Sequence, residues 1–166
     1  LGSGVFEEAQ SFPGVCGTSA NAVFKVLLAD FNNDGFKDIA RLQNCGANGV
    51  FQLWVFNPGL QEYSSVYEKF IGYARSMDCG DVDSDGDLDI FFARETGQTD
   101  LIYMNNGMGN FVDSGQDLGG SRTGHAVALG DLDGDGLLDA FVVNDGAPDQ
   151  VFRNTGGGNF VQIGEY

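Results

Sequence analysis

Short stretches of alternating apolar and polar residues recur along the chain, and each of them leads into an acidic turn. Val26 and Leu28, for example, stand four and two positions before the first aspartate of the first turn. Alternation with a period of two is typical of a strand with one buried face. A brief apolar run follows each turn, as at 90–93 and 140–143. We therefore expect a strand on either side of each acidic turn.

The acidic turns belong to a long sequence repeat. Three nine-residue segments, 30–38, 81–89 and 131–139, align without a gap, and their first aspartates are 51 and 50 residues apart. A second landmark follows each segment: an asparagine, a glycine two residues later, and an aromatic residue six positions after the asparagine. These landmarks are Asn57 with Tyr63, Asn105 with Phe111, and Asn154 with Phe160. Two landmarks in the same phase establish the repeat.

Each repeat holds roughly four short strands. Besides the two strands beside the acidic turn, an apolar run before the asparagine predicts a third strand, and the aromatic residue would begin a fourth. No segment has a helical apolar stripe with caps, so we expect an all-β chain. Four antiparallel strands per repeat fit the blade of a β-propeller-like array. We expect one repeat domain over 1–166, with blades at 6–62, 63–110 and 111–160 and an extra C-terminal strand at 160–166.

The acidic segments share the pattern Asp-x-[Asp/Asn]-x-Asp-Gly-x-x-Asp, whose residues we number 1 to 9. Side-chain oxygens at positions 1, 3 and 5 converge if the chain curls sharply, and glycine at position 6 permits that curl. The carbonyl of position 7 and the aspartate at position 9 would complete an all-oxygen shell. Calcium prefers such a shell, with six to eight oxygen ligands at flexible angles.

The pattern predicts three calcium sites. The first would use Asp30, Asn32, Asp34, the carbonyl of Phe36 and Asp38. The second would use Asp81, Asp83, Asp85, the carbonyl of Asp87 and Asp89. The third would use Asp131, Asp133, Asp135, the carbonyl of Leu137 and Asp139.

Metal-free Asp-Gly turns are the alternative to calcium loops, but so many like charges close together would repel one another without a cation. Magnesium is disfavoured because it requires a smaller octahedral shell. An EF-hand is excluded, since its glutamate at position 12 is replaced by Arg41, Phe92 and Val142. The first site carries the least negative charge, because it contains Asn32 and Lys37.

The chain is strongly acidic: 24 Asp and Glu face 8 Lys and Arg among 166 residues, a formal net charge of -16. Three Ca²⁺ would add six positive charges and leave -10. Nucleic acids and anionic membranes need a basic face, so we expect neither as a partner. No apolar segment approaches the roughly 18 residues of a membrane span, so we expect no membrane insertion.

Three cysteines are present, an odd number. Cys16 and Cys45 both lie in insertions of the first repeat, which suggests a disulfide between them. Cys79 stands on the apolar alternation and is expected to be a buried free thiol. A disulfide fits an oxidising, extracellular compartment, so we expect a secreted protein.

Catalytic signals are weak. His125 is the only histidine, and its place in a predicted strand favours a surface or core-edge role. No Gly-x-Ser-x-Gly elbow or phosphate-binding loop before a helix is present. The carboxylates are assigned to the acidic loops. We expect that the chain is not an enzyme.

The three acidic loops, each followed by Asn-x-Gly and an aromatic residue, resemble FG-GAP repeats, also called VCBS repeats. Such repeats occur in integrin α-subunit propellers and in many secreted adhesins and lectins. The resemblance extends from about Phe6 to Phe160. It implies calcium-binding blades that act in adhesion or in binding a carbohydrate or protein. Closed propellers of the family usually have seven blades, whereas this chain has three.

Three blades would leave two open apolar faces, so we expect self-association or further blades. A ring of two chains, an extracellular filament and a piece of a longer propeller remain open, as does an accessory domain of a secreted enzyme. Candidate aromatic residues for a carbohydrate are Trp54, Tyr63, Tyr67 and Tyr103. Of these, Trp54 and Tyr103 lie in apolar runs and are expected to pack.

Overall fold

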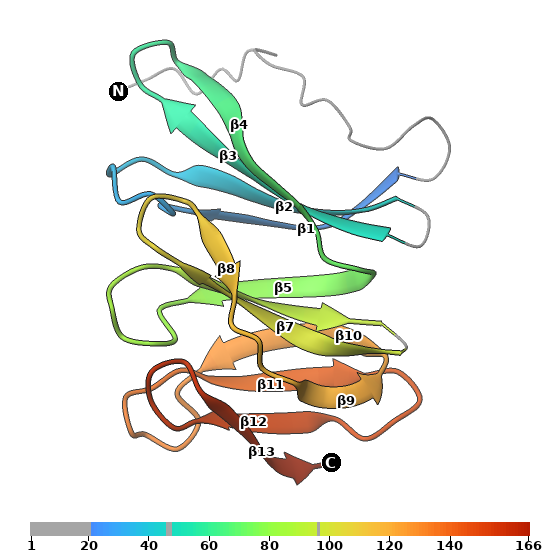
Figure 1. Ribbon diagram of the computed structural model, residues 1–166. Coiled ribbons are helices and arrows are strands. Elements are labelled where there is room, and N and C mark those ends of the chain that lie inside the picture. Colours follow the sequence, from blue (N-terminus) through green and yellow to red (C-terminus); the bar gives the residue numbers. More distant parts are fainter. Residues whose placement is uncertain (1–20, 46–47, 96) are drawn as a thin grey trace, which may run out of the picture.

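The structure, a computed structural model, describes residues 21–45, 48–95 and 97–166. Within these ranges the chain forms 13 strands and no helix, so the all-β prediction is confirmed. The strands form three antiparallel sheets that stack on one another in chain order (Figure 1). The described residues therefore contain no helix that could span a membrane.

Each sheet is built on a meander of four strands, in which consecutive strands are hydrogen-bonded neighbours. The first sheet contains β1 (Asn21–Ala29), β2 (Asp38–Cys45), β3 (Asn48–Asn57) and β4 (Glu62–Phe70). The second contains β5 (Ala74–Gly80), β6 (Asp89–Arg94), β7 (Gln98–Asn105) and β8 (Phe111–Asp113), and β9 (Leu118–Arg122) also pairs with β7. The third contains β10 (Gly124–Gly130), β11 (Asp139–Asn144), β12 (Gln150–Asn154) and β13 (Phe160–Glu165). Each repeat therefore contains a four-stranded meander, and the second sheet has β9 as a fifth strand.

The aromatic residue after each asparagine and glycine landmark lies at the start of the fourth strand of the same sheet. Phe111 pairs with Asn105, and Phe160 pairs with Asn154, across these turns. The blade boundaries predicted at 63 and 111 thus separate the fourth strand of a sheet from its third. The strand predicted at 160–166 is present as β13, but it is hydrogen-bonded to β12 and completes the third sheet, so it is not an extra strand. Residues 6–20 of the predicted first blade lie outside the described residues.

Two apolar clusters lie between the sheets and hold the stack together. Between the first and second sheets, the Phe51 ring meets those of Phe92 and Phe111 at centroid distances of 5.3 and 5.2 Å. Between the second and third, Phe91 meets Phe160 at 5.9 Å. Neighbouring side chains on a strand point to opposite faces, so Phe91 and Phe92 serve different interfaces. A sheet buried on both faces explains the unbroken apolar run at 90–93.

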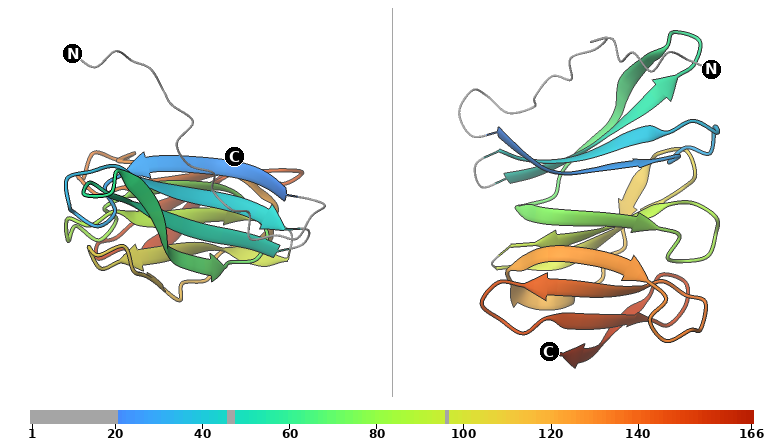
Figure 2. Two further views of the ribbon diagram at one scale, coloured as in Figure 1. Left: turned by 90° about the horizontal axis from the view of Figure 1, so that it is seen from above. Right: turned by 180° about the vertical axis from the view of Figure 1, so that it is seen from behind.

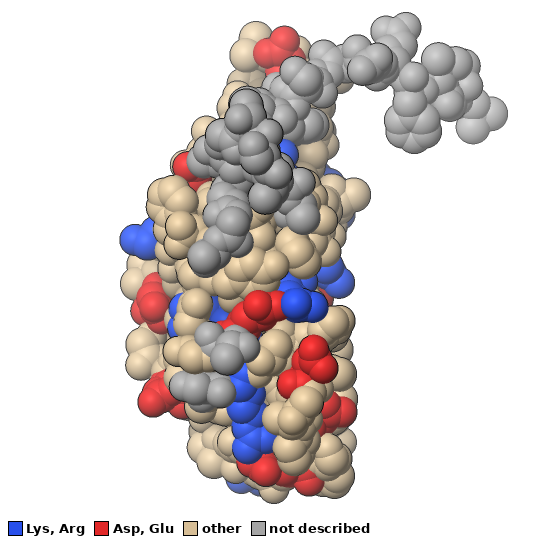
Figure 3. Space-filling model, turned by 90° about the vertical axis from the view of Figure 1, so that its right-hand side faces the viewer, with Lys and Arg blue, Asp and Glu red and all other residues tan. Residues whose placement is uncertain are grey.

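The acidic turns join the first and second strands of each sheet, and all three lie along one edge of the stack, at the left of Figure 1. The first strands also lie close together, with β5 beside both β1 and β10. The right-hand view of Figure 2 shows the same order of sheets from behind, and the left-hand view shows the sheets lying over one another. On the opposite edge, which faces the viewer in Figure 3, basic and acidic side chains are interleaved. The fold therefore collects the acidic loops on one side.

A buried carboxylate, that of Asp100, fixes the turn between β6 and β7. The side chain is 5% exposed, and its Oδ1 accepts a hydrogen bond from the Arg94 N–H at 2.8 Å. Burial is the main cause that raises the pKa of Asp100 to about 7, although the Arg94 N–H and charge act in the opposite direction. The ionised form of Asp100 therefore costs stability in the folded chain.

We expect Asp100→Asn to change how stability depends on pH. The folded chain holds the Asp100 proton more tightly than the unfolded chain, so this residue adds stability as the pH falls from about 8 to 4. Asparagine keeps an acceptor oxygen but does not titrate. At high pH the variant should have the larger free energy of unfolding. This difference from the parent should shrink by a few kcal/mol as the pH falls from about 8 to 4, at roughly 1.4 kcal/mol per pKa unit. Urea denaturation at several pH values, without calcium, measures it; a pH-independent difference would contradict the assignment.

Candidate metal centre

Each acidic loop curls around the carboxylate at its first position. In the first loop Asp30 accepts hydrogen bonds from the N–H groups of Asp34 and Gly35, at 3.1 and 2.8 Å. Asp81 accepts the two corresponding bonds in the second loop, both at 3.0 Å. In the third loop the N–H donors to Asp131 are at positions 4 and 6. One carboxylate thus organises the whole turn.

Left-handed backbone conformations at positions 4 and 6 make this curl possible. The glycine at position 6 has φ of +87°, +95° and +90° in the three loops: Gly35, Gly86 and Gly136. Such angles are unfavourable for residues with a Cβ, which confirms the role predicted for glycine. Position 4 is also left-handed, and it is occupied by Asn33, Ser84 and Gly134.

The aspartate at position 9 is buried and ties the loop to its sheet. Asp89 is 1% exposed, and its Oδ2 accepts a hydrogen bond from the N–H of Val82 at 3.0 Å. Its Oδ1 accepts one from the N–H of Asn105, at the end of β7, at 2.8 Å. The other two loops repeat both bonds through Asp38 and Asp139.

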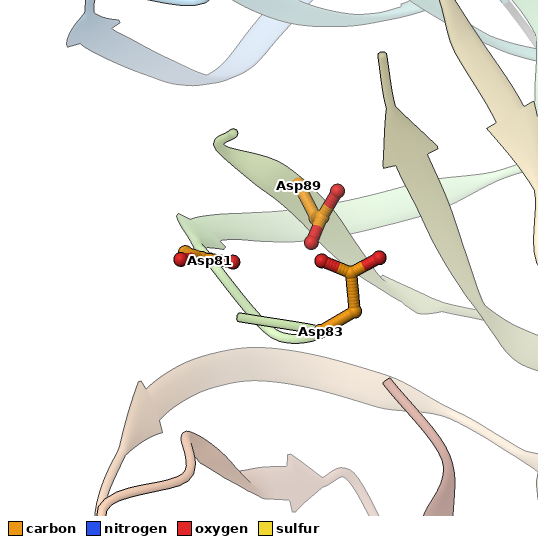
Figure 4. Close-up of side chains that lie close together, drawn as sticks. All are labelled: Asp81, Asp83 and Asp89. Atoms are coloured by element: carbon orange, nitrogen blue, oxygen red, sulfur yellow. The ribbon is translucent and has the colours of Figure 1, made fainter. Parts of the chain in front are cut away.

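Positions 1, 3 and 9 bring three carboxylates together in the second and third loops. One oxygen from each of Asp81, Asp83 and Asp89 lies within 4.8 Å of the others, and Figure 4 shows the carboxylates of Asp83 and Asp89 turned toward each other. The third loop forms the same cluster from its positions 1, 3 and 9. Calcium binds oxygen at 2.3–2.6 Å, so ligands on opposite sides of one ion lie about 5 Å apart. The spacing of both clusters fits this ion.

Electrostatics in the second loop disfavours ionised carboxylates. The pKa of Asp89 is raised to about 6, mainly by burial. The N–H groups of Asn105 and Val82 lower it, and the nearby acidic charges of Asp83 and Asp85 contribute to the rise. The pKa of Asp83 is also raised, first by burial and then by its acidic neighbours. Neither of the ion pairs found among the described residues involves a loop aspartate. A divalent cation would remove this repulsion and favour the charged carboxylates.

Other predicted ligands lie outside these clusters. The position-5 carboxylates of Asp85 and Asp135 each accept a hydrogen bond from the N–H of position 7, at 2.9 Å. In the first loop position 3 is Asn32, which has no carboxylate, and its side-chain amide donates to Asp34 at 2.9 Å. The carbonyl ligands at Phe36, Asp87 and Leu137 stay predictions.

Asn105 and Asn154 are landmarks of the repeat, but the sequence pattern predicts no function for them. Their amides donate to backbone carbonyls in the acidic loop of the preceding sheet. The Asn57 landmark is not their structural equivalent, because the N–H of Phe56 makes the matching bond to Asp38. The recurrence of asparagine at the end of the third strand was the signal that could have revealed this role.

The aromatic residues predicted as candidates for carbohydrate binding are buried or make hydrogen bonds within the fold. Trp54 and Tyr103 are 5% and 4% exposed, which confirms that they pack. The Tyr67 hydroxyl donates to the Phe111 carbonyl at 2.8 Å, and the Tyr63 hydroxyl donates to the Lys37 carbonyl at 3.3 Å.

His125 is exposed, and its Nδ1 lies 3.5 Å from a guanidinium nitrogen of Arg75. Cys79 is a free cysteine, half-buried against the first apolar cluster. Cys16 and the Cys45 side chain lie outside the described residues, so the disulfide stays a prediction.

Comparison with known families identifies the repeat. Residues 81–142 match the family model of the FG-GAP-like repeat. This segment is therefore similar to an FG-GAP-like repeat. The matched segment begins at Asp81 and ends in β11, so it contains the second and third acidic loops. A comparison with curated proteins gives no match. FG-GAP-like repeats often bind Ca²⁺, and the all-oxygen clusters of this segment fit that cation.

Proposed function

We propose that the chain is an extracellular, non-catalytic module of the β-propeller type, which binds Ca²⁺ in its three acidic loops and acts in adhesion. Its ligand would be a glycan or a protein. The observation that carries the proposal is the repeated cluster of three carboxylates at positions 1, 3 and 9, within an FG-GAP-like repeat. Millimolar extracellular calcium would fill such sites even if each of them bound the ion weakly.

Calcium would supply much of the stability of this fold. A ligand that binds only the folded state stabilises it by RT ln(1 + [L]/Kd). At about twenty times Kd this amounts to roughly 1.8 kcal/mol per site, or on the order of 5 kcal/mol for three sites. The net stability of a small domain is of similar size.

We therefore expect excess chelator to lower the melting temperature markedly. Asp83→Asn and Asp133→Asn should each remove part of the calcium-dependent rise, because each removes one clustered carboxylate. Asp117→Asn is the matched control, since Asp117 is exposed and outside the loops. Differential scanning calorimetry with calcium and with chelator measures all four proteins. An unchanged melting curve in chelator would contradict the proposal.

A structural subunit that assembles with its own copies is the second candidate, favoured by the outer face of the third sheet. Leu132, in the third acidic loop, is 57% exposed, and Val161 and Ile163 in β13 are 53% and 58% exposed. In the first two sheets the residues equivalent to Leu132 are Phe31 and Val82, which are 0% and 1% exposed beneath the following sheet. A second copy of the chain would cover the same positions in the third sheet.

In calcium, we expect light scattering after size exclusion to give a mass above that of the 17.7 kDa monomer. Leu132→Asp and Ile163→Asp should shift the protein toward monomer, because each places a charge on the face. Leu60→Asp is the control, since Leu60 is 66% exposed but lies in the turn between β3 and β4. A monodisperse monomer of the parent chain would contradict assembly. Specific binding on a glycan array would then favour the adhesion module.

A further inference from the structure

Two asparagine side chains connect each acidic loop to the next. Asn105 donates an amide hydrogen to the Phe31 carbonyl in the first loop, at 2.8 Å, while its own N–H donates to Asp89 in the second loop. Asn154 repeats the arrangement one sheet later. Its amide donates to the Val82 carbonyl at 2.6 Å, and its N–H donates to Oδ1 of Asp139 at 2.9 Å.

The contacted carbonyls belong to residues that also hold the preceding position-9 carboxylate. The N–H of Phe31 donates to Asp38 at 3.0 Å, and the N–H of Val82 donates to Asp89 at 3.0 Å. The result is one continuous series of hydrogen bonds through all three loops. Its order is Asp38, Phe31, Asn105, Asp89, Val82, Asn154 and Asp139.

Every member of this series is shielded from water. Asn105 is 6% exposed and Asn154 is 0% exposed, and the residues between them are 1% exposed. Each side-chain amide makes all its hydrogen bonds. It also donates to a carbonyl in the acidic loop of its own repeat, that of Leu88 or Leu138, and its oxygen accepts a hydrogen bond from a backbone N–H. Such an amide has no alternative partner, and hydrogen bonds in a low-dielectric interior are strong. A shift of one loop residue is therefore passed to the neighbouring carboxylate.

We propose that Asn105 and Asn154 are positioning residues that couple adjacent calcium loops, so that Ca²⁺ in one loop raises the affinity of its neighbour. The inference rests on the proposed binding of calcium. An ion that orders the position-9 carboxylate also fixes the residue at position 2, and through the asparagine it pre-orders the next carboxylate. Coupling between binding sites is reciprocal, and commonly amounts to roughly 5- to 150-fold in affinity.

The test is a calcium titration of the full chain by isothermal calorimetry. The parent should bind with positive cooperativity. Asn154→Ala should abolish the coupling between the second and third loops and weaken average affinity on the order of fivefold. Asn105→Ala should do the same for the first and second loops, which provides a second variant if one fails to fold. Asn110→Ala is the control, because Asn110 is exposed at the turn after β7.

Stability of each variant in chelator separates coupling from general damage. A merely structural role for the asparagines would lower the urea midpoint in chelator and leave the cooperativity of calcium binding unchanged. Independent binding in the parent, or equal cooperativity in parent and both variants, would overturn the coupling but leave the calcium proposal intact. No heat of binding in the parent would overturn both.

Discussion

The structure depends on one buried carboxylate per sheet, that of the last aspartate in each acidic loop: Asp38, Asp89 and Asp139. A carboxylate removed from water is costly unless hydrogen bonds or a cation compensate it. Two backbone N–H groups, one from the loop and one from the third strand, compensate part of this cost in each sheet. The raised pKa of Asp89, about 6, indicates that hydrogen bonds alone leave a deficit, which a cation would remove.

The same constraint joins the loops to the stacking of the sheets. The residue at position 2 gives its N–H to the buried carboxylate and, in the first two loops, inserts its side chain under the next sheet, as Phe31 and Val82 do. The asparagine of that next sheet then binds its carbonyl. Loop closure and sheet stacking are therefore one arrangement. The third sheet has the same loop but no following sheet in the described residues, which leaves Leu132 exposed.

Much of this arrangement follows from sequence pattern, because the residues concerned have few alternatives. Alternation before each loop, the glycine at position 6 and the apolar runs gave the strands and turns correctly. The partner of the fourth strand could not be derived, since periodicity does not say which neighbour a strand pairs with. The Asn57 landmark misled for a similar reason: it stands six residues before Tyr63, yet Tyr63 pairs with Phe56. Only the register of hydrogen bonds distinguishes these positions.

The most direct test of the calcium-loop account is anomalous diffraction from crystals of the full chain grown in calcium and exchanged into terbium. Terbium replaces calcium at oxygen sites and scatters strongly. If the acidic loops bind calcium, anomalous peaks will lie in the second and third loops, each within bonding distance of the carboxylates at positions 1, 3 and 9. A weaker peak will lie in the first loop beside Asn32. Crystals without peaks in the second and third loops at saturating metal would contradict it.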